Sequence, residues 1–212
     1  LKMIKREYLL IGVVVAVVSV YFLIATPAMN DDGFHYEGFA ESLAHGKLDF
    51  KSFYGFQGLS FFAVPVFWLT GSHDSIIIMS AIFSLLSIPL AYFIGRDFYG
   101  NKRAGIYFLI LFLLTPYPYT TMMRGFQEAT VLFFVLLAIY ASIHKKLWSP
   151  VAWAVGGVVK PFVLVLFPLF IKDFLNSKKI AWLIFGLLIG GAYLGASYYQ
   201  TGHLVNNAAI NS

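Results

Sequence analysis

The sequence lacks cysteine altogether and contains few charged residues, which make up only 12% of its 212 positions. Without cysteine the chain cannot be a disulfide-stapled secreted domain. A soluble domain of this size has too little interior for a composition that is 59% apolar, and the same apolar content excludes a disordered chain. The net charge of +5 is read as a signal of membrane orientation rather than of nucleic-acid binding. The composition therefore predicts an all-α, polytopic integral membrane protein.

Long apolar runs predict where the chain crosses the membrane. A helix needs about 20 apolar residues to span a hydrocarbon core of about 30 Å. We expect about seven transmembrane helices within a single transmembrane module, 1–212. The runs are 8–28, 75–94, 104–115 lengthened by the aromatic stretch through Tyr119, 126–143, two short passes within 148–171 that turn near Lys160, and 180–199. Any C-terminal soluble domain is expected to lie outside this chain.

The first outer loop, 29–74, is expected to hold two juxtamembrane helices. Apolar residues recur at helical spacing in Tyr36, Phe39, Ala40 and Leu43, which indicates an amphipathic surface helix. Asp31 or Asp32 would cap this helix at its start, Gly46 would end it, and a capping pair at His73 and Asp74 would open the span that follows. The apolar run 57–69 is too short to span and is interrupted by Pro65, so it predicts a second interfacial or re-entrant helix.

Acidic and histidine side chains on the first surface helix raise the alternative of a metal site. Glu37, Glu41 and His45 follow one another at intervals of one turn. We interpret this stripe as the solvated face of an amphipathic helix. The sequence therefore assigns no residue to a metal.

The distribution of basic residues decides the orientation. With two short passes in 148–171 and a cytoplasmic N-terminus, 11 of the 15 basic residues lie inside and seven of the ten acidic residues lie outside. A single straight span in 148–171 would weaken this bias and bury Lys160. The positive-inside rule therefore favours seven crossings, with an N-terminus in the cytoplasm and an active face outside, most simply in a prokaryotic plasma membrane.

Five ionisable residues fall at the outer membrane boundary on ends of different helices. They are Asp31, Asp32, Arg124, Glu128 and Lys160. Ionisable groups at membrane depth usually serve function, because a carboxylate there can act as a base and a cation can hold a phosphate. Structural alternatives stay open: helix capping by the two aspartates, an ion pair between Arg124 and Glu128, and a snorkelling Lys160.

The order of motifs resembles the C-superfold glycosyltransferases that use lipid-linked sugars, especially protein O-mannosyltransferases and aminoarabinose transferases. Asp32, Tyr36, Ala40 and Leu43 keep the spacing of the family's first outer motif. Further similarities lie in the basic turn 95–103, the second outer motif 124–128, the stretch 156–161 and the loop start 199–206. The second surface helix departs from the family, because Gln57-Gly58-Leu59 stands where a proline pair is usual.

The resemblance implies an inverting transfer of sugar from a polyprenyl-phosphate donor to a protein, lipid or glycan acceptor on the outer face. It implies that Asp32 is the catalytic base, with Asp31 as its neighbour or substitute. It further implies that Glu128 orients the acceptor or assists the first acid, and that Arg124 and Lys160 neutralise the donor phosphate. Apart from the resemblance, the aromatic enrichment mostly reflects spans and interfacial belts, although a few aromatics such as Tyr36 and Tyr54 are expected to line a lipid groove. Some members of the superfold use a divalent metal, although no metal-ligand spacing indicates one here.

Two alternatives to an active enzyme are kept. The chain can be a non-enzymatic transporter or lipid-handling subunit that binds membrane lipids through Arg124 and Lys160. The absence of an internal repeat and the acidic cluster in the outer loop favour the enzyme. Alternatively, the chain is a truncated module that is inactive without its acceptor-binding domain.

Overall fold

The computed structural model describes residues 6–25, 27–53, 55–71 and 74–204, and these form helices and no strands. The all-α prediction is therefore confirmed for the described part of the chain. Tyr54, His73 and the tail from 205, which includes the last two residues of the motif 199–206, lie outside the described residues. The elements are α1 Arg6–Ile24, α2 Asp31–Ala44, α3 Gly58–Thr70, α4 Ser75–Tyr99, α5 Lys102–Leu114, α6 Tyr117–Arg124, α7 Glu128–Ile143, α8 Ser149–Val159, η1 Pro161–Leu166, α9 Phe167–Phe174 and α10 Ile180–Thr201.

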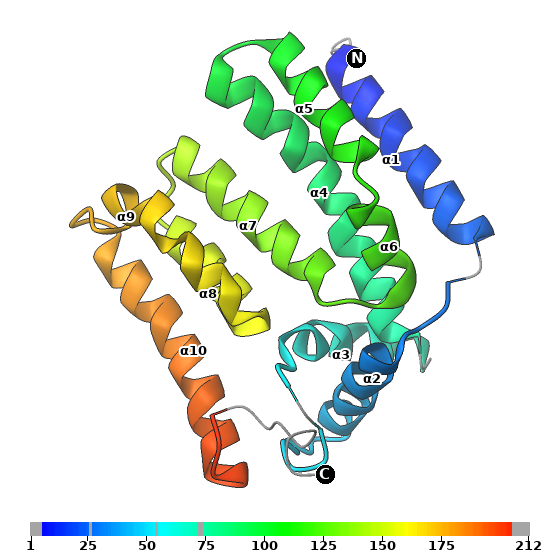
Figure 1. Ribbon diagram of the computed structural model, residues 1–212, viewed down its shortest axis with the longest axis vertical. Coiled ribbons are helices and arrows are strands. Elements are labelled where there is room, and N and C mark those ends of the chain that lie inside the picture. The colour runs from blue at the N-terminus through cyan, green and yellow to red at the C-terminus, as the bar shows by residue number, and fades with distance from the viewer. Residues whose placement is uncertain (1–5, 26, 54, 72–73, 205–212) are drawn as a thin grey trace.

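The helices form a row in which α4 is central (Figure 1). Helices α5 and α6 pack along one side of α4 and α7 packs along another, while α8 lies on α7 and α10 lies on α8. Among the described residues, three helices are long and apolar enough to cross a membrane: α1, α4 and α10, with 19, 25 and 22 residues. The other four predicted crossings consist of shorter elements, so the arrangement of seven crossings remains a prediction.

The segment predicted to make two short passes forms a helical hairpin. Helix α8 ends at Lys160, whose backbone is extended (φ −152°, ψ 116°), because a residue before proline disfavours the helical conformation. The chain then returns along α8 through η1 and α9. Trp153 Nε1 donates to the Val163 carbonyl oxygen across 3.1 Å, and Ser149 Oγ donates to Asp173 Oδ2 across 3.2 Å. The two ends of the hairpin therefore meet, in agreement with the predicted turn near Lys160.

The third predicted span, expected to end near Pro116 and to be lengthened by the aromatic stretch through Tyr119, consists of two helices. Helix α5 ends at Leu114 and a separate α6 begins at Tyr117. The break falls at Thr115–Pro116, because proline lacks the N–H that would continue the helix. Together α5 and α6 still run along the length of α4 (Figure 1).

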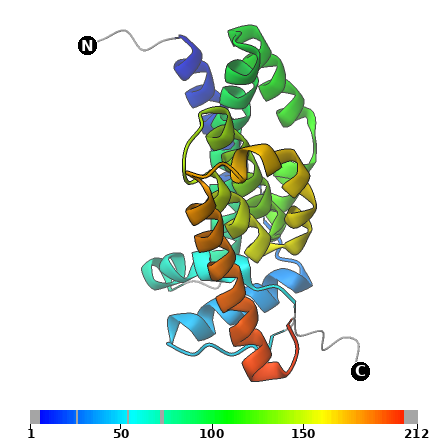
Figure 2. The same ribbon diagram turned by 90° about the vertical axis from the view of Figure 1, so that its left-hand side faces the viewer.

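Helices α2 and α3 lie across the direction of the long helices (Figure 2). Their bounds agree with the two predicted surface helices, and Pro65 is contained inside α3. Gly46 follows the end of α2 in the left-handed region, with φ +76°, where glycine has no steric penalty. The described part of the connection between α1 and α4 therefore has the predicted secondary structure.

One side chain of α2 was wrongly assigned to the solvated face. Glu37 has only 4% of its surface exposed. Its carboxylate accepts a hydrogen bond from Ser75 Oγ at 2.7 Å and one from the backbone N–H of Ile76 at 2.8 Å. These groups lie in the first turn of α4, where the backbone N–H groups lack helical partners and the helix dipole favours an anion. Glu37 therefore locks the surface helix onto the central helix.

Polar side chains join neighbouring elements at both ends of the bundle. At the end away from α2, Lys102 pairs with Glu7 (3.0 Å) and His144 with Asp97 (3.0 Å). At the same end, the buried Lys179 donates to both oxygens of Asp173. These contacts gather the starts of α1, α5 and α10 with the ends of α4 and α7. Most basic residues predicted to be cytoplasmic thus share one end, and α2 and α3 occupy the other.

Candidate functional site

The side chains singled out from the sequence lie on α2, at the end of α6, at the start of α7 and at the α8–η1 junction. Asp31, Asp32 and Tyr36 belong to α2, Arg124 ends α6, Glu128 begins α7, and Lys160 separates α8 from η1. Two close backbone approaches hold these elements together. A Cβ on Gly33 of α2 would lie 3.2 Å from the Arg124 carbonyl oxygen, and a Cβ on Gly58 of α3 would lie 2.5 Å from Val159 Cα.

The start of α2 is fixed against the end of α6. The backbone N–H of Ala28 donates to the Met123 carbonyl oxygen (3.1 Å), and that of Asn30 donates to the Arg124 carbonyl oxygen (3.3 Å). The capping residue is Asn30, whose side-chain oxygen accepts from the Gly33 N–H at 3.0 Å.

The prediction that Asp31 or Asp32 caps the helix is therefore wrong. Both aspartates fall inside the first turn of α2, where a carboxylate is favoured by the helix dipole. Asp31 is exposed and Asp32 is half-buried. Neither carboxylate therefore provides the side-chain cap of α2.

Glu128 and Lys160 form an ion pair across the chain. The side chains are 22% and 35% exposed, respectively, so the pair is partly shielded from water and accessible from outside. The alternative of a helical ion pair between Arg124 and Glu128 fails, because Gly125 adopts φ +70° between them and ends α6. The two residues therefore belong to different helices, and Arg124 is exposed.

Tyr36 packs between α2 and α3. Its backbone carbonyl oxygen accepts from Ser60 Oγ at 2.8 Å, which fixes α2 to α3. Its ring packs against the cluster that contains Leu59 and Ala129, and Ala129 is next to Glu128. Tyr36 thus joins α2 to α3 next to the start of α7, and its predicted place in a lipid groove stays a prediction.

Buried glutamines complete the site, and the sequence reasoning missed them. Gln127 Nε2 donates to the Phe56 carbonyl oxygen (2.5 Å), while the N–H of Gln57 donates to the Tyr193 hydroxyl oxygen (2.7 Å). Among the described residues, Gln127 Oε1 is buried without a hydrogen-bond partner. Such groups are rare in folded proteins. The signal in the sequence that could have indicated them is a glutamine at the start of each of two otherwise apolar runs.

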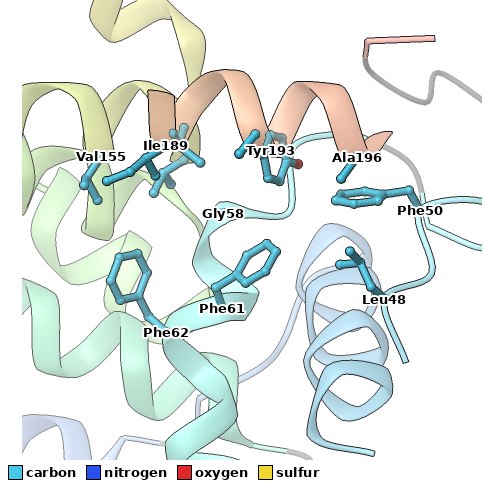
Figure 3. Close-up of a pocket in the computed structure, with 12 residues that line it drawn as sticks. Leu48, Phe50, Gly58, Phe61, Phe62, Val155, Ile189, Tyr193 and Ala196 are labelled. Atoms are coloured by element: carbon cyan, nitrogen blue, oxygen red, sulfur yellow. The ribbon is translucent and has the colours of Figure 1, made fainter. Parts of the chain in front are cut away.

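A cavity of about 390 Å³ opens beside this network (Figure 3). Apolar side chains line it from α3, α8, α10 and the connection before α3, among them Phe50, Phe61, Val155 and Ile189. The ring of Tyr193 stands in the same wall, 5.3 Å from the ring of Phe50. The cavity therefore suits an apolar ligand.

A second apolar cavity of about 430 Å³ shares Val158 and Tyr193 with the first. Its wall also contains Pro161 and the small residues Gly157 and Gly190. The residues on either side of Lys160 in the sequence thus line the two cavities, since Val159 lines the first and Pro161 the second. A charged pair and two apolar cavities are therefore adjacent along the chain.

The connection between α2 and α3 is held by Asp49. Its carboxylate accepts from Ser52 Oγ at 2.5 Å, and from the backbone N–H groups of Lys51 and Ser52 at 3.0 and 3.1 Å. The hydroxyl hydrogen bond is the largest cause, and with the backbone hydrogen bonds it outweighs partial burial and holds the pKa of Asp49 below its ordinary value. This turn positions Leu48 and Phe50, which line the first cavity.

Among the described residues, no three His, Asp or Glu side chains are grouped closely enough to hold a metal ion. Comparison with known proteins does not extend the assignment: no family model, curated protein or solved structure matches this chain. The arguments for function accordingly rest on the motifs and on the geometry described above.

Proposed function

We propose that this chain is the membrane module of a glycosyltransferase that moves a sugar from a polyprenyl phosphate to an acceptor hydroxyl at the outer face. The observation that carries the proposal is the Glu128–Lys160 ion pair beside the two apolar cavities. A polyprenyl phosphate needs a cation for its phosphate and an apolar space for its chain. The combination supports a lipid phosphate as the ligand.

The reaction proceeds by direct displacement. The acceptor oxygen forms a bond to the anomeric carbon on the face opposite the phosphate, and the bond between that carbon and the phosphate oxygen breaks. The electron pair leaves with the polyprenyl phosphate, and the hydroxyl proton passes to a carboxylate. The configuration of the sugar is therefore inverted.

Each charged group has a role in this scheme. Asp32, half-buried in the first turn of α2, is the base, and Asp31 is its neighbour or substitute. Lys160 and Arg124 stabilise the phosphate as negative charge develops on it. Glu128 holds Lys160 in place and orients the acceptor. The acceptor is a protein, a lipid or a glycan.

Substitution of the aspartates tests the proposed base. The whole protein that contains this module is reconstituted in liposomes with polyprenyl-phosphate mannose or polyprenyl-phosphate glucose, and release of free sugar is measured with water as the acceptor. Asp31→Asn combined with Asp32→Asn should lower turnover by about 10²-fold or more while donor binding persists. Glu41→Gln on the same helix is the matched control. Full turnover in the double variant would refute the mechanism.

Lipid handling without catalysis is the second candidate, and the two apolar cavities favour it as well. A transporter or lipid-handling subunit would bind the donor through Lys160 and move it intact. In the same liposomes, Lys160→Gln should then weaken binding, while no variant or acceptor would yield released sugar. That outcome would favour a lipid-binding protein over an enzyme.

A further inference from the structure

A polar cavity lies at the end of the bundle opposite the proposed active site. It has a volume of about 490 Å³ and is lined by Arg96, Asp97, Gly100, Lys102, Ile143 and His144. The connection between α4 and α5 forms one wall, and the end of α7 forms the other. The proposed transfer reaction uses none of these residues.

Three of the lining side chains are cationic or can become so. Arg96 donates from Nε and Nη2 to the two oxygens of Asp97, which uses two of the five N–H groups of a guanidinium. Lys102 pairs with Glu7 at 3.0 Å, yet its side chain is 68% exposed. His144 contacts Asp97 through Nε2 at 3.0 Å and is 34% exposed. The nitrogen-bearing ends of these three side chains are held in place by acidic residues and are accessible to a further anion.

Basic residues outnumber acidic ones around the cavity. Arg103 follows Lys102, and Lys145 and Lys146 follow His144. With Arg6, Arg96 and Lys102 this makes six permanent cations, against the two acids Glu7 and Asp97. The local surplus of four positive charges (6 − 2) favours an anionic ligand.

An apolar surface adjoins the polar cavity. A second cavity of about 480 Å³ shares Lys102 and is lined in part by Leu10, Tyr92 and Ile106. Tyr107, the residue after Ile106, is 64% exposed. These residues belong to α1, α4 and α5, of which α1 and α4 are long enough to cross a membrane. A ligand here meets cations on one side and apolar side chains on the other.

We propose that this cavity binds the headgroup of an anionic phospholipid whose acyl chains lie against α1 and α5. Basic pockets between membrane helices at the membrane–water boundary recognise such headgroups. Free phosphate would use the cations alone, whereas the adjoining apolar wall favours a lipid. The proposal does not depend on the glycosyltransferase activity.

The absence of cysteine permits a local test by fluorescence quenching. Tyr99→Cys places a fluorophore at the end of α4, next to Gly100 in the cavity wall. The labelled protein is reconstituted with brominated phosphatidylglycerol or brominated phosphatidylcholine, which quench on contact. We expect phosphatidylglycerol to bind about fivefold more tightly than phosphatidylcholine, and Lys102→Gln to remove most of this preference.

Matched controls separate this site from general attraction to anionic lipid. A label at Leu69→Cys, at the end of α3 and 87% exposed, should show no preference. Lys47→Gln, which removes one charge near α2, should leave the Tyr99 signal unchanged, and Lys102→Arg should restore the preference. Equal quenching by both lipids at Tyr99 would overturn the proposal, as would competition by inorganic phosphate with no preference between lipids. A preference for phosphatidylglycerol that persists unchanged in a folded Lys102→Gln variant would overturn it as well.

Discussion

Glu37 is the residue whose environment differs most from the pattern around it. It sits on an amphipathic helix among exposed polar residues, yet its carboxylate is buried against Ser75 and Ile76. A buried acceptor that satisfies the first turn of a helix stabilises both partners, because those N–H groups have no other helical acceptor. The side chain therefore couples the position of Asp32, five residues earlier, to the central helix.

Replacement of Glu37 should destabilise the fold in proportion to the hydrogen-bond acceptors that are removed. Glu37→Ala leaves Ser75 Oγ and the Ile76 N–H without this partner and should cost about 1–3 kcal/mol of unfolding free energy. Glu37→Gln retains one acceptor oxygen and should cost less. Thermal unfolding in detergent measures both. Glu41→Ala on the same helix is the control, and an equal loss in Glu37→Ala and Glu41→Ala would contradict the capping role.

Asp49 predicts a dependence on pH in the connection before α3. Its pKa is lower in the folded protein than the ordinary value of 3.8, so the stabilising contribution is complete above that value and is lost as the pH falls through the lowered pKa. The chemical shift of the Ser52 amide should therefore titrate with a midpoint below 3.8. The transition should vanish in Asp49→Asn, and a midpoint above that value would rule out the assigned hydrogen bonds.

At the scale of elements, the packing of α3 on the end of α8 creates the first cavity. Gly58 permits this contact, since a Cβ there would lie only 2.5 Å from the backbone of Val159. Backbone atoms cannot move aside as a flexible side chain can. The glycine thus allows α3 to approach the Lys160 turn, which brings Phe61 to the cavity opposite Ile189 (Figure 3).

Gly58→Ala should accordingly separate α3 from α8. We expect a loss of about 1–3 kcal/mol in unfolding free energy, as for other forced insertions into packed interiors, together with weaker donor binding. Gly195→Ala in α10 provides the comparison, because nothing lies within 4 Å of a Cβ at that position and Gly195 lines neither apolar cavity. Thermal unfolding and donor binding are measured on both variants, and wild-type values for Gly58→Ala would show that the close approach is dispensable.

For the whole molecule, the decisive feature is the division of polar contacts between two ends. One end contains α2, α3 and the Glu128–Lys160 pair, and the other contains the ion pairs of Glu7, Asp97 and Asp173. A helical hairpin at 149–174 returns the chain to the second end, so that α10 begins there. This arrangement predicts which loops share one side of the membrane.

Single cysteines introduced into this cysteine-free chain can map the two sides. Lys47→Cys should react with a membrane-impermeant thiol reagent from one side only, and Lys145→Cys and Lys178→Cys should react from the opposite side only. The side from which Lys178→Cys reacts distinguishes two passes from one in the hairpin segment. If 148–171 were one straight span, Lys178→Cys would react from the same side as Lys47→Cys, which would contradict the arrangement with seven crossings.

Local chemistry explains why much of the helical structure could be predicted. Apolar runs, the proline after Lys160 and the helical spacing from Tyr36 to Leu43 act over a few residues, so they determine helix positions and the hairpin turn. The break before α6 follows the same rule, since Pro116 marks it in the sequence.

The sequence by itself thus determined the apolar, all-helical character of the chain, the surface helices and the ends at which charged residues gather. Only the tertiary structure decided the partners: Glu37 against α4, Glu128 with Lys160, and two cavities around Tyr193. The physical reason is range. Helix formation depends on neighbours in the chain, whereas a buried carboxylate or an ion pair depends on residues 32 to 39 positions away, which only packing brings together.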